Sequence, residues 1–203
     1  MAIAGLVRKS MDFGERIFAI LLAGPFLWSF AIAMRTHPNV VLTAISEMLS
    51  VMFILMRRPG EVACSPWAVL VAFAGTALPL LVRPGGTDLV PTLLSSTVMS
   101  CGLALSVASK LYLNRSFGLI AANRGVKVGG PYRLVRHPMY LGYIITQTGF
   151  LLSNFDWKNS AIYTVAWSCQ LLRLREEERV LRHDQAYRDF TGKVSSRLIP
   201  GIF

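Results

Sequence analysis

Long apolar segments separated by short charged ones dominate the sequence. A helix needs roughly 20 apolar residues to cross about 30 Å of hydrocarbon. Six apolar runs predict helices at residues 17–34, 40–56, 67–82, 90–109, 139–155 and 161–172. The last run is short enough to be a re-entrant segment or the tilted half of a hairpin with the fifth. The pattern predicts an all-α, polytopic transmembrane bundle of about six spans.

The basic residues predict how these spans are oriented. If the spans alternate across a membrane, Arg35, Arg83 and Lys158 lie on the side opposite the N-terminus. The other 18 of the 21 lysines and arginines then share the side that holds both chain ends. Because basic loops are retained in the cytoplasm, we expect both termini to be cytoplasmic. A compact chain without a eukaryotic-looking retention signal favours a bacterial inner membrane over the endoplasmic reticulum.

Composition agrees with a membrane protein and argues against other classes. Of the 203 residues, 53% are hydrophobic and only 16% are charged, yet the net charge is +10, whereas soluble domains are about 25% charged. The basic residues lie between the apolar runs and not over one polar face, so we expect no nucleic-acid partner. The three cysteines form no C-x-x-C pair, which argues against a disulfide framework and structural zinc.

Candidate chemistry lies just before the fifth apolar run. Pro138 suits the first position of a helix, so His137 is predicted near the N-cap and Tyr140 in the first turn. A helix start carries free N–H groups and a partial positive charge, which favour a bound carboxylate. Arg133 and Arg136 add cationic donors at the same level. The segment therefore predicts an anion and cofactor site at the cytoplasmic membrane boundary. Alternatively, the arginines contact lipid phosphates and the tyrosines are interfacial aromatics.

A run of three carboxylates, Glu176, Glu177 and Glu178, follows the sixth apolar run. Successive helical residues point about 100° apart, so all three cannot face one site. An inward-facing carboxylate can hold an ammonium or sulfonium group, or accept a proton. The alternative is a solvated helix with salt bridges to neighbouring arginines. The tail beyond it, with Tyr187 and Phe190, predicts an amphipathic segment lying on the membrane.

One acidic residue interrupts the second apolar run. A charge at the bilayer centre costs at least about 2.5–3.5 kcal/mol on insertion scales. Glu47 is therefore expected either to line a route for a substrate or to be a protonated or hydrogen-bonded packing residue.

The ordered motifs resemble those of the isoprenylcysteine carboxyl methyltransferase family, which is related to the membrane phospholipid N-methyltransferases. The resemblance covers roughly residues 110–200 and rests on two blocks: Gly130-Pro131-Tyr132-Arg133-x-x-Arg136-His137-Pro138-x-Tyr140-x-Gly142 and Glu177-Glu178-x-x-Leu181. His183-Asp184 departs from the usual Phe-Gly, which leaves open which of the three glutamates faces the site.

The resemblance implies S-adenosyl-L-methionine (SAM) as methyl donor and a lipophilic acceptor that arrives from the membrane. Residues 1–109 would hold four spans, and residues 110–203 the SAM-binding region, two further spans and a cytoplasmic tail. The implied catalytic residues are Arg136, Glu177 and Glu178. The implied cofactor-binding residues are Gly130, Tyr132, Arg133, His137, Tyr140 and Leu141, with no metal.

Several functional alternatives remain at this point. The acceptor can be a lipid, a hydrophobic metabolite or a prenylcysteine carboxylate, and the sequence does not give the oligomeric state. From other classes, a small transporter or channel and a non-catalytic scaffold of the same fold are the competing hypotheses. The six spans show no inverted repeat, which argues against a transporter.

Overall fold

The computed structural model describes residues 13–21, 24, 28, 40–58, 60–62 and 65–202. Most of the first predicted span (17–34) lies outside these residues, as does the side chain of Glu47, so the predictions for both stand as made. The described chain is mostly helical. Its elements are α2 (Val40–Met56), β1 (Glu61–Val62), α3 (Pro66–Ala77), η1 (Leu78–Leu81), α4 (Thr92–Leu113), η2 (Asn114–Ser116), β2 (Ala122–Asn123), η3 (Gly130–Arg133), α5 (Pro138–Ser153), α6 (Trp157–Leu181) and α7 (Gln185–Lys193).

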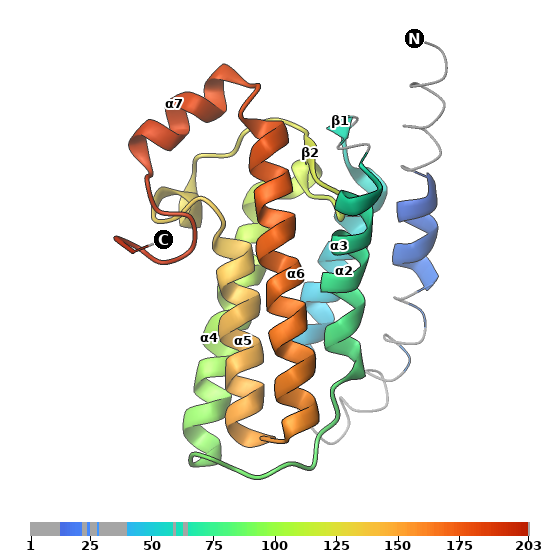
Figure 1. Cartoon of the computed structure of the whole chain (residues 1–203), viewed down its shortest axis with the longest axis vertical. Helices are drawn as coiled ribbons and strands as arrows, with labels where there is room; N and C mark the ends of the chain where they lie inside the picture. The colour runs from blue at the N-terminus through green and yellow to red at the C-terminus, as the bar shows by residue number, and fades with distance from the viewer. Residues whose placement is uncertain are drawn as a thin grey trace.

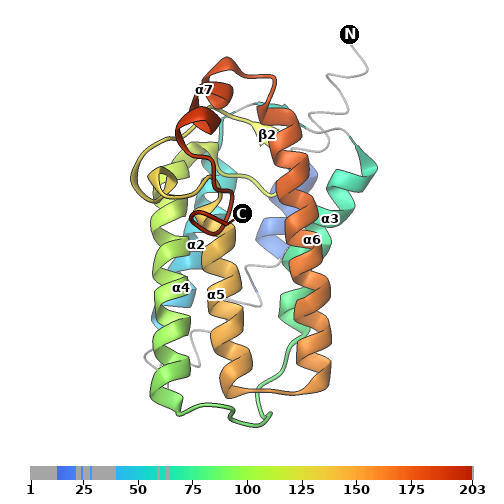
Figure 2. The ribbon, with the colours of Figure 1, turned by 60° about the vertical axis from the view of Figure 1, so that its left-hand side comes forward.

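The long helices run side by side along the longest axis of the molecule (Figure 1). Helix α4 packs on α5 and α2, and α3 packs on α6; both views show α4 next to α5 (Figure 2). Helix α7 and the two-stranded sheet lie together at one end of the bundle. In the sheet, β1 and β2 pair antiparallel, with Glu61 opposite Asn123.

Helices occupy five of the predicted apolar runs. The second, fourth and fifth runs correspond to α2, α4 and α5, the third to α3 with η1, and the sixth to part of α6. Among the described residues, one helix, Thr92–Ser116, is long and apolar enough to cross a membrane. The all-α prediction is confirmed for the described chain, whereas six membrane crossings are not.

Small residues allow α4 and α5 to approach closely. A Cβ atom added to Gly102 of α4 would lie 2.5 Å from the backbone nitrogen of Thr146, and one added to Gly142 would lie 2.7 Å from the carbonyl oxygen of Gly102. Ser95 and Ser106 of α4 are also buried. The contact is therefore made largely by backbone, as is common between helices in membranes.

A buried ion pair fixes the helical residues 13–21 to the end that carries the sheet. Glu15 and Arg57 pair with almost no exposed side-chain surface. The same Glu15 carboxylate accepts hydrogen bonds from the backbone N–H groups of Leu119 and Ile120. Since a buried charge needs partners, this contact holds the loop before β2 in place.

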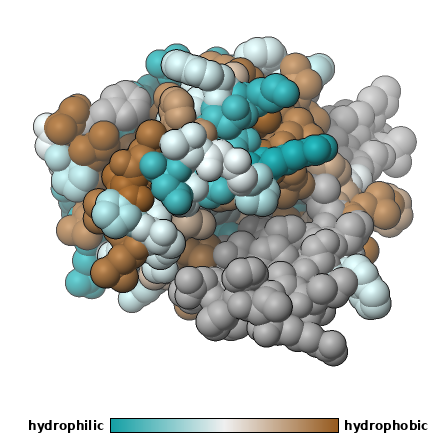
Figure 3. All heavy atoms as spheres, turned by 90° about the horizontal axis from the view of Figure 1, so that it is seen from below, coloured by the Kyte–Doolittle hydropathy of each residue, from teal (hydrophilic) through white to brown (hydrophobic). Residues whose placement is uncertain are grey.

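Two asparagines join the turns at the opposite end. Asn159 donates to the carbonyl oxygens of Arg83 and Asn154, at 2.8 and 3.1 Å. The Gly85 N–H donates to the Asn154 side chain at 3.1 Å. Viewed from this end, hydrophilic atoms gather near the centre and hydrophobic atoms are exposed at the sides (Figure 3). The hydrogen bonds of Asn154 and Asn159 join the loop after η1 to the α5–α6 turn.

Candidate active site

The N-terminus of α5 forms the first wall of the candidate site. His137 is the N-cap residue and Pro138 occupies the first turn, as the sequence predicts. The backbone N–H of Arg136 donates to the Ser196 carbonyl oxygen at 3.0 Å, and that of His137 to the Arg197 carbonyl oxygen at 2.9 Å. The C-terminal tail is therefore hydrogen-bonded across the start of α5.

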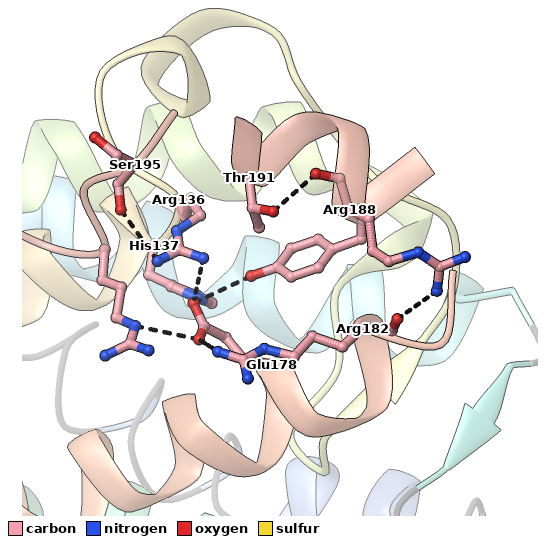
Figure 4. A network of polar contacts seen from close by, with 9 residues as sticks. Arg136, His137, Glu178, Arg182, Arg188, Thr191 and Ser195 are labelled. Carbon is pink, nitrogen blue, oxygen red and sulfur yellow. Dashed lines mark hydrogen bonds and ion pairs between the residues drawn. The ribbon is translucent and has the colours of Figure 1, made fainter. Parts of the chain in front are cut away.

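Glu178, near the end of α6, connects this helix start to the tail (Figure 4). Its Oε1 atom lies 3.1 Å from Nη1 of Arg136 and 3.3 Å from Nε2 of His137. The Tyr187 hydroxyl donates to the same oxygen at 3.2 Å. The other oxygen, Oε2, lies 3.2 Å from Nε of Arg197 and 3.4 Å from Nη2 of Arg182. Both carboxylate oxygens are thus fully engaged within the protein.

These contacts decide the charge state of Glu178. Burial alone raises the pKa of a carboxyl group because it disfavours the charged form. Here the hydrogen bond and charge of His137, together with the charges of Arg136 and Arg197, outweigh burial and lower the pKa from 4.5 to about 2. Glu178 is therefore ionised at neutral pH and is held as a structural anion.

Glu177 faces a different partner. Its Oε2 atom accepts a hydrogen bond from the Tyr140 hydroxyl at 2.9 Å. The Arg173 guanidinium lies over the Tyr140 ring, 5.3 Å from its centroid, and donates to the Gly118 carbonyl oxygen at 3.0 Å. Glu176 instead pairs with Arg179 at 3.0 Å. The three adjacent glutamates thus have three separate sets of contacts, as their helical spacing requires.

A pocket lies between the start of α5, the end of α6 and α7. It encloses about 550 Å³ of empty space when its open mouth and the adjoining solvent are included. Its lining residues are Leu113, Ser116, Ala122, Arg124, Gly125, Val126, Lys127, Tyr132, Arg136, His137, Met139, Tyr140, Glu177, Leu181, Tyr187 and Phe190. Apolar and charged groups therefore both face this space.

The structure brings part of the sequence-predicted set to this pocket. Five of the residues proposed from the motifs line it: Tyr132, Arg136, His137, Tyr140 and Glu177. They come from η3, the start of α5 and the end of α6. Residues about 40 positions apart in the sequence thus share one pocket, as the motif pair predicts. Their chemical roles stay predictions.

The other predicted residues lie elsewhere. Gly130 has a φ of +56°, and a Cβ atom there would lie 2.3 Å from the Tyr112 ring, so this position needs glycine for packing. Arg133 is exposed, and Leu141 packs against the hydrophobic core. Glu178 does not line the pocket but holds two residues that do, Arg136 and His137.

Two lining features were not predicted from the sequence. Arg124, in the loop after β2, is buried and lines the pocket; nothing in its local sequence marked it. Tyr187 and Phe190 were predicted to lie on the membrane. They are instead buried against Tyr132, because α7 folds back over the pocket. The amphipathic pattern of α7 was visible, but the partner of its apolar face was not.

A known protein family matches the part of the sequence that contains this site. Residues 92–188, slightly less than half of the chain, match the phospholipid methyltransferase family. The matched region begins with α4 and contains both motif blocks and every Glu178 contact described above except that with Arg197. The resemblance found in the sequence agrees with this match, which covers the part of the chain that holds the pocket. A comparison with curated proteins finds no match.

Proposed function

We propose that the protein is an integral membrane methyltransferase that transfers a methyl group from SAM to a lipophilic acceptor. The observation that carries the proposal is the shared pocket, in which Arg136 and His137 from the start of α5 meet Glu177 from the end of α6. The family match over residues 92–188 supports methyl transfer. It gives no support to a transporter or to a scaffold.

We further propose the six-span topology with both termini in the cytoplasm. Large apolar side chains are exposed along the helices, among them Leu70 and Leu94 at 59% and 51%. Small and polar residues such as Ser106 and Gly102 are buried between α4 and α5 instead. Apolar residues outside and small residues inside suit a lipid environment. The site would then lie at the cytoplasmic edge of the bilayer.

The pocket residues fit the charged parts of SAM. Nε of Arg136 is buried and has no hydrogen-bond partner among the described residues, and the carboxylate of an amino acid is a suitable acceptor for it. Glu177 offers a carboxylate to an ammonium or sulfonium group on the opposite side. When bound, SAM supplies an electrophilic methyl group on a positively charged sulfur. No metal is needed for this transfer.

We assign to Glu177 the role of acting on the acceptor. Its hydrogen bond to Tyr140 fixes the direction of the carboxylate, and positioning is a major part of such a displacement. The bond from sulfur to the methyl carbon breaks as the bond from that carbon to the acceptor forms. A proton leaving an amine, hydroxyl or thiol acceptor would pass to Glu177. A carboxylate acceptor would release no proton.

The test is to identify the methylated product. Membranes containing the protein are incubated with isotope-labelled SAM and lipid extracts, and labelled products are identified by mass spectrometry. Glu177→Gln should lower the turnover number by about 100-fold or more, the scale of lost general base catalysis. Glu176→Gln is the matched control because its carboxylate pairs with Arg179.

Two results would contradict this proposal. One is the absence of any labelled product from parent membranes that contain folded protein. The other is equal turnover by the parent, Glu177→Gln and Glu176→Gln when the identified product is a methylated amine, hydroxyl or thiol.

A further inference from the structure

A second pocket lies on the other side of Glu178. It is lined by Arg175, Glu178, Arg179, Arg182, His183 and Arg197, and it encloses about 860 Å³ of empty space including its open mouth. We call it the basic pocket. None of its lining residues lines the pocket that we propose for SAM. Glu178 contacts Arg136 and His137 of the first pocket and Arg182 and Arg197 of the basic pocket; Figure 4 shows this network around Glu178.

Positive charge exceeds negative charge in the basic pocket. Arg182 and Arg197 contact Oε2 of Glu178, and Arg179 contacts Glu176. Among the described residues, Arg175 makes no ion pair. The four arginines therefore outnumber the two glutamates that they contact. Their side chains reach solvent, with exposures of 72% for Arg179 and 60% for Arg182, so a ligand has access to them.

Two separate segments build this cluster. Arg175, Arg179 and Arg182 follow each other at intervals of four and three residues, which puts them on one face at the end of α6. Arg197 comes from the tail, where the hydrogen bond from His137 to its carbonyl oxygen fixes the backbone. The cluster is therefore made by tertiary structure and not only by a run of basic sequence.

Stabilisation of the C-terminal end of α6 explains only part of this arginine cluster. Basic residues in the last turn of a helix stabilise the partial negative charge of that end, which accounts for Arg179 and Arg182. It does not account for Arg197, which lies in another segment, or for Arg175, which lies almost two turns before the end of α6.

We propose that the basic pocket binds a phosphate group, that of an anionic lipid headgroup. Guanidinium groups bind phosphate oxygens through paired, charge-assisted hydrogen bonds. Arg175 and Arg179 follow the predicted sixth span by three and seven residues, roughly 5–10 Å along a helix. The polar headgroup layer is about 5–8 Å thick on each side of the hydrocarbon. The depth thus favours lipid phosphate over free phosphate.

The experiment measures binding, independently of methyl transfer. Purified full-length protein in detergent is titrated with dihexanoyl phosphatidylglycerol, with inorganic phosphate, and with a dihexanoyl glycerol that lacks phosphate, using the melting temperature as readout. The test variant is Arg175→Gln/Arg179→Gln. The control is Arg58→Gln, an exposed arginine on the same predicted side of the membrane and outside both pockets.

We expect phosphatidylglycerol to raise the melting temperature of the parent and of Arg58→Gln. The double variant should bind it at least about tenfold more weakly, since each lost charge-assisted contact weakens binding. If inorganic phosphate alone shows this pattern, the pocket binds phosphate from a soluble source. Equal binding by all three proteins, or equal binding of the phosphate-free lipid, would overturn the proposal.

Discussion

The adjacent residues Glu177 and Glu178 have different contacts because successive side chains of a helix point about 100° apart. Glu178 is enclosed by Arg136, His137 and other donors, which keep it charged and make it a structural centre. Glu177 accepts a hydrogen bond from the Tyr140 hydroxyl and lines the pocket. Glu178 joins the start of α5 to the end of α6 and the tail, whereas Glu177 faces the pocket. This division favours Glu177 over Glu178 as the reacting carboxylate.

The sequence predicted where α5 begins. It did not predict that Glu177 and Glu178 would have different contacts. Pro138 marks the first turn of α5, because proline suits that position, and so His137 could be placed as the N-cap. The direction of each glutamate depends on the rotation of α6 against α5 and on donors from the tail. Tyr187 and Arg197 supply two of these contacts, and no local pattern reveals that they reach Glu178.

Replacing Glu178 tests its structural role through pH. Its folded-state pKa is about 2 against an ordinary 4.5. A lowered folded-state pKa stabilises the fold above pH 4.5, and this stabilisation is lost as the pH falls towards 2. The shift corresponds to about 3 kcal/mol. We therefore expect Glu178→Gln to be less stable than the parent at pH 7 and to lose less free energy of unfolding between pH 5 and 2.

The measurement is denaturation in detergent, followed by tryptophan fluorescence at several pH values. The difference in free energy of unfolding between parent and variant, measured at each pH, gives the contribution of the Glu178 carboxyl group separately from those of other titrating groups. A difference that does not change between pH 5 and 2 would show that Glu178 has an ordinary pKa.

At the scale of elements, the packing of α4 on α5 sets the position of the site. Gly102 and Gly142 bring the two backbones together, and α5 carries His137 and Tyr140 at its start. The sequence of α4, which is rich in serine, glycine and alanine, permits such close packing. It did not predict which helix would be the partner. Likewise the sequence predicted an amphipathic tail but not that Tyr132 would cover the apolar face of α7.

A methyl group at the α4–α5 contact should loosen the site. Gly102→Ala places a Cβ atom 2.5 Å from the Thr146 backbone nitrogen, and such overpacking typically costs about 1–3 kcal/mol. We expect a lower melting temperature and weaker SAM binding. In contrast, Gly192 in α7 has no atom near an added Cβ, so Gly192→Ala should be neutral or slightly stabilising. Equal melting temperatures for the two variants would show that the close approach is unimportant.

For the whole molecule, the position of the membrane decides which side of the bilayer holds the proposed site. The residues that line the site and the basic pocket lie at the end of the bundle that carries α7. The turns joined by Asn154 and Asn159 lie at the other end. The charge distribution of the sequence predicts that the first end is cytoplasmic. Helix positions could be predicted from apolar runs alone. Apolar runs alone do not establish that each helix crosses the membrane. A 16-residue helix such as α5 is shorter than the thickness of an average hydrocarbon layer.

Cysteine labelling tests this orientation. Lys158, in the first turn of α6, and Arg58, after α2, are exposed positions at opposite ends of the bundle. Each is replaced by cysteine in a background with the native cysteines replaced by serine. We expect a membrane-impermeant maleimide added to intact cells with a permeable outer membrane to label residue 158 and not residue 58. Inverted vesicles should give the opposite pattern. Labelling of both positions from one side would contradict the six-span topology.

The most direct test of the central claim is equilibrium binding of SAM to the purified protein in detergent, measured by calorimetry. We predict saturable binding of SAM and of its demethylated product. We also predict that His137→Ala weakens both at least about tenfold, because a residue of the pocket wall is lost, while Arg58→Gln binds like the parent. Circular dichroism of each variant confirms that its helices are retained. No binding at millimolar SAM, or equal binding by folded His137→Ala, would contradict the proposed site.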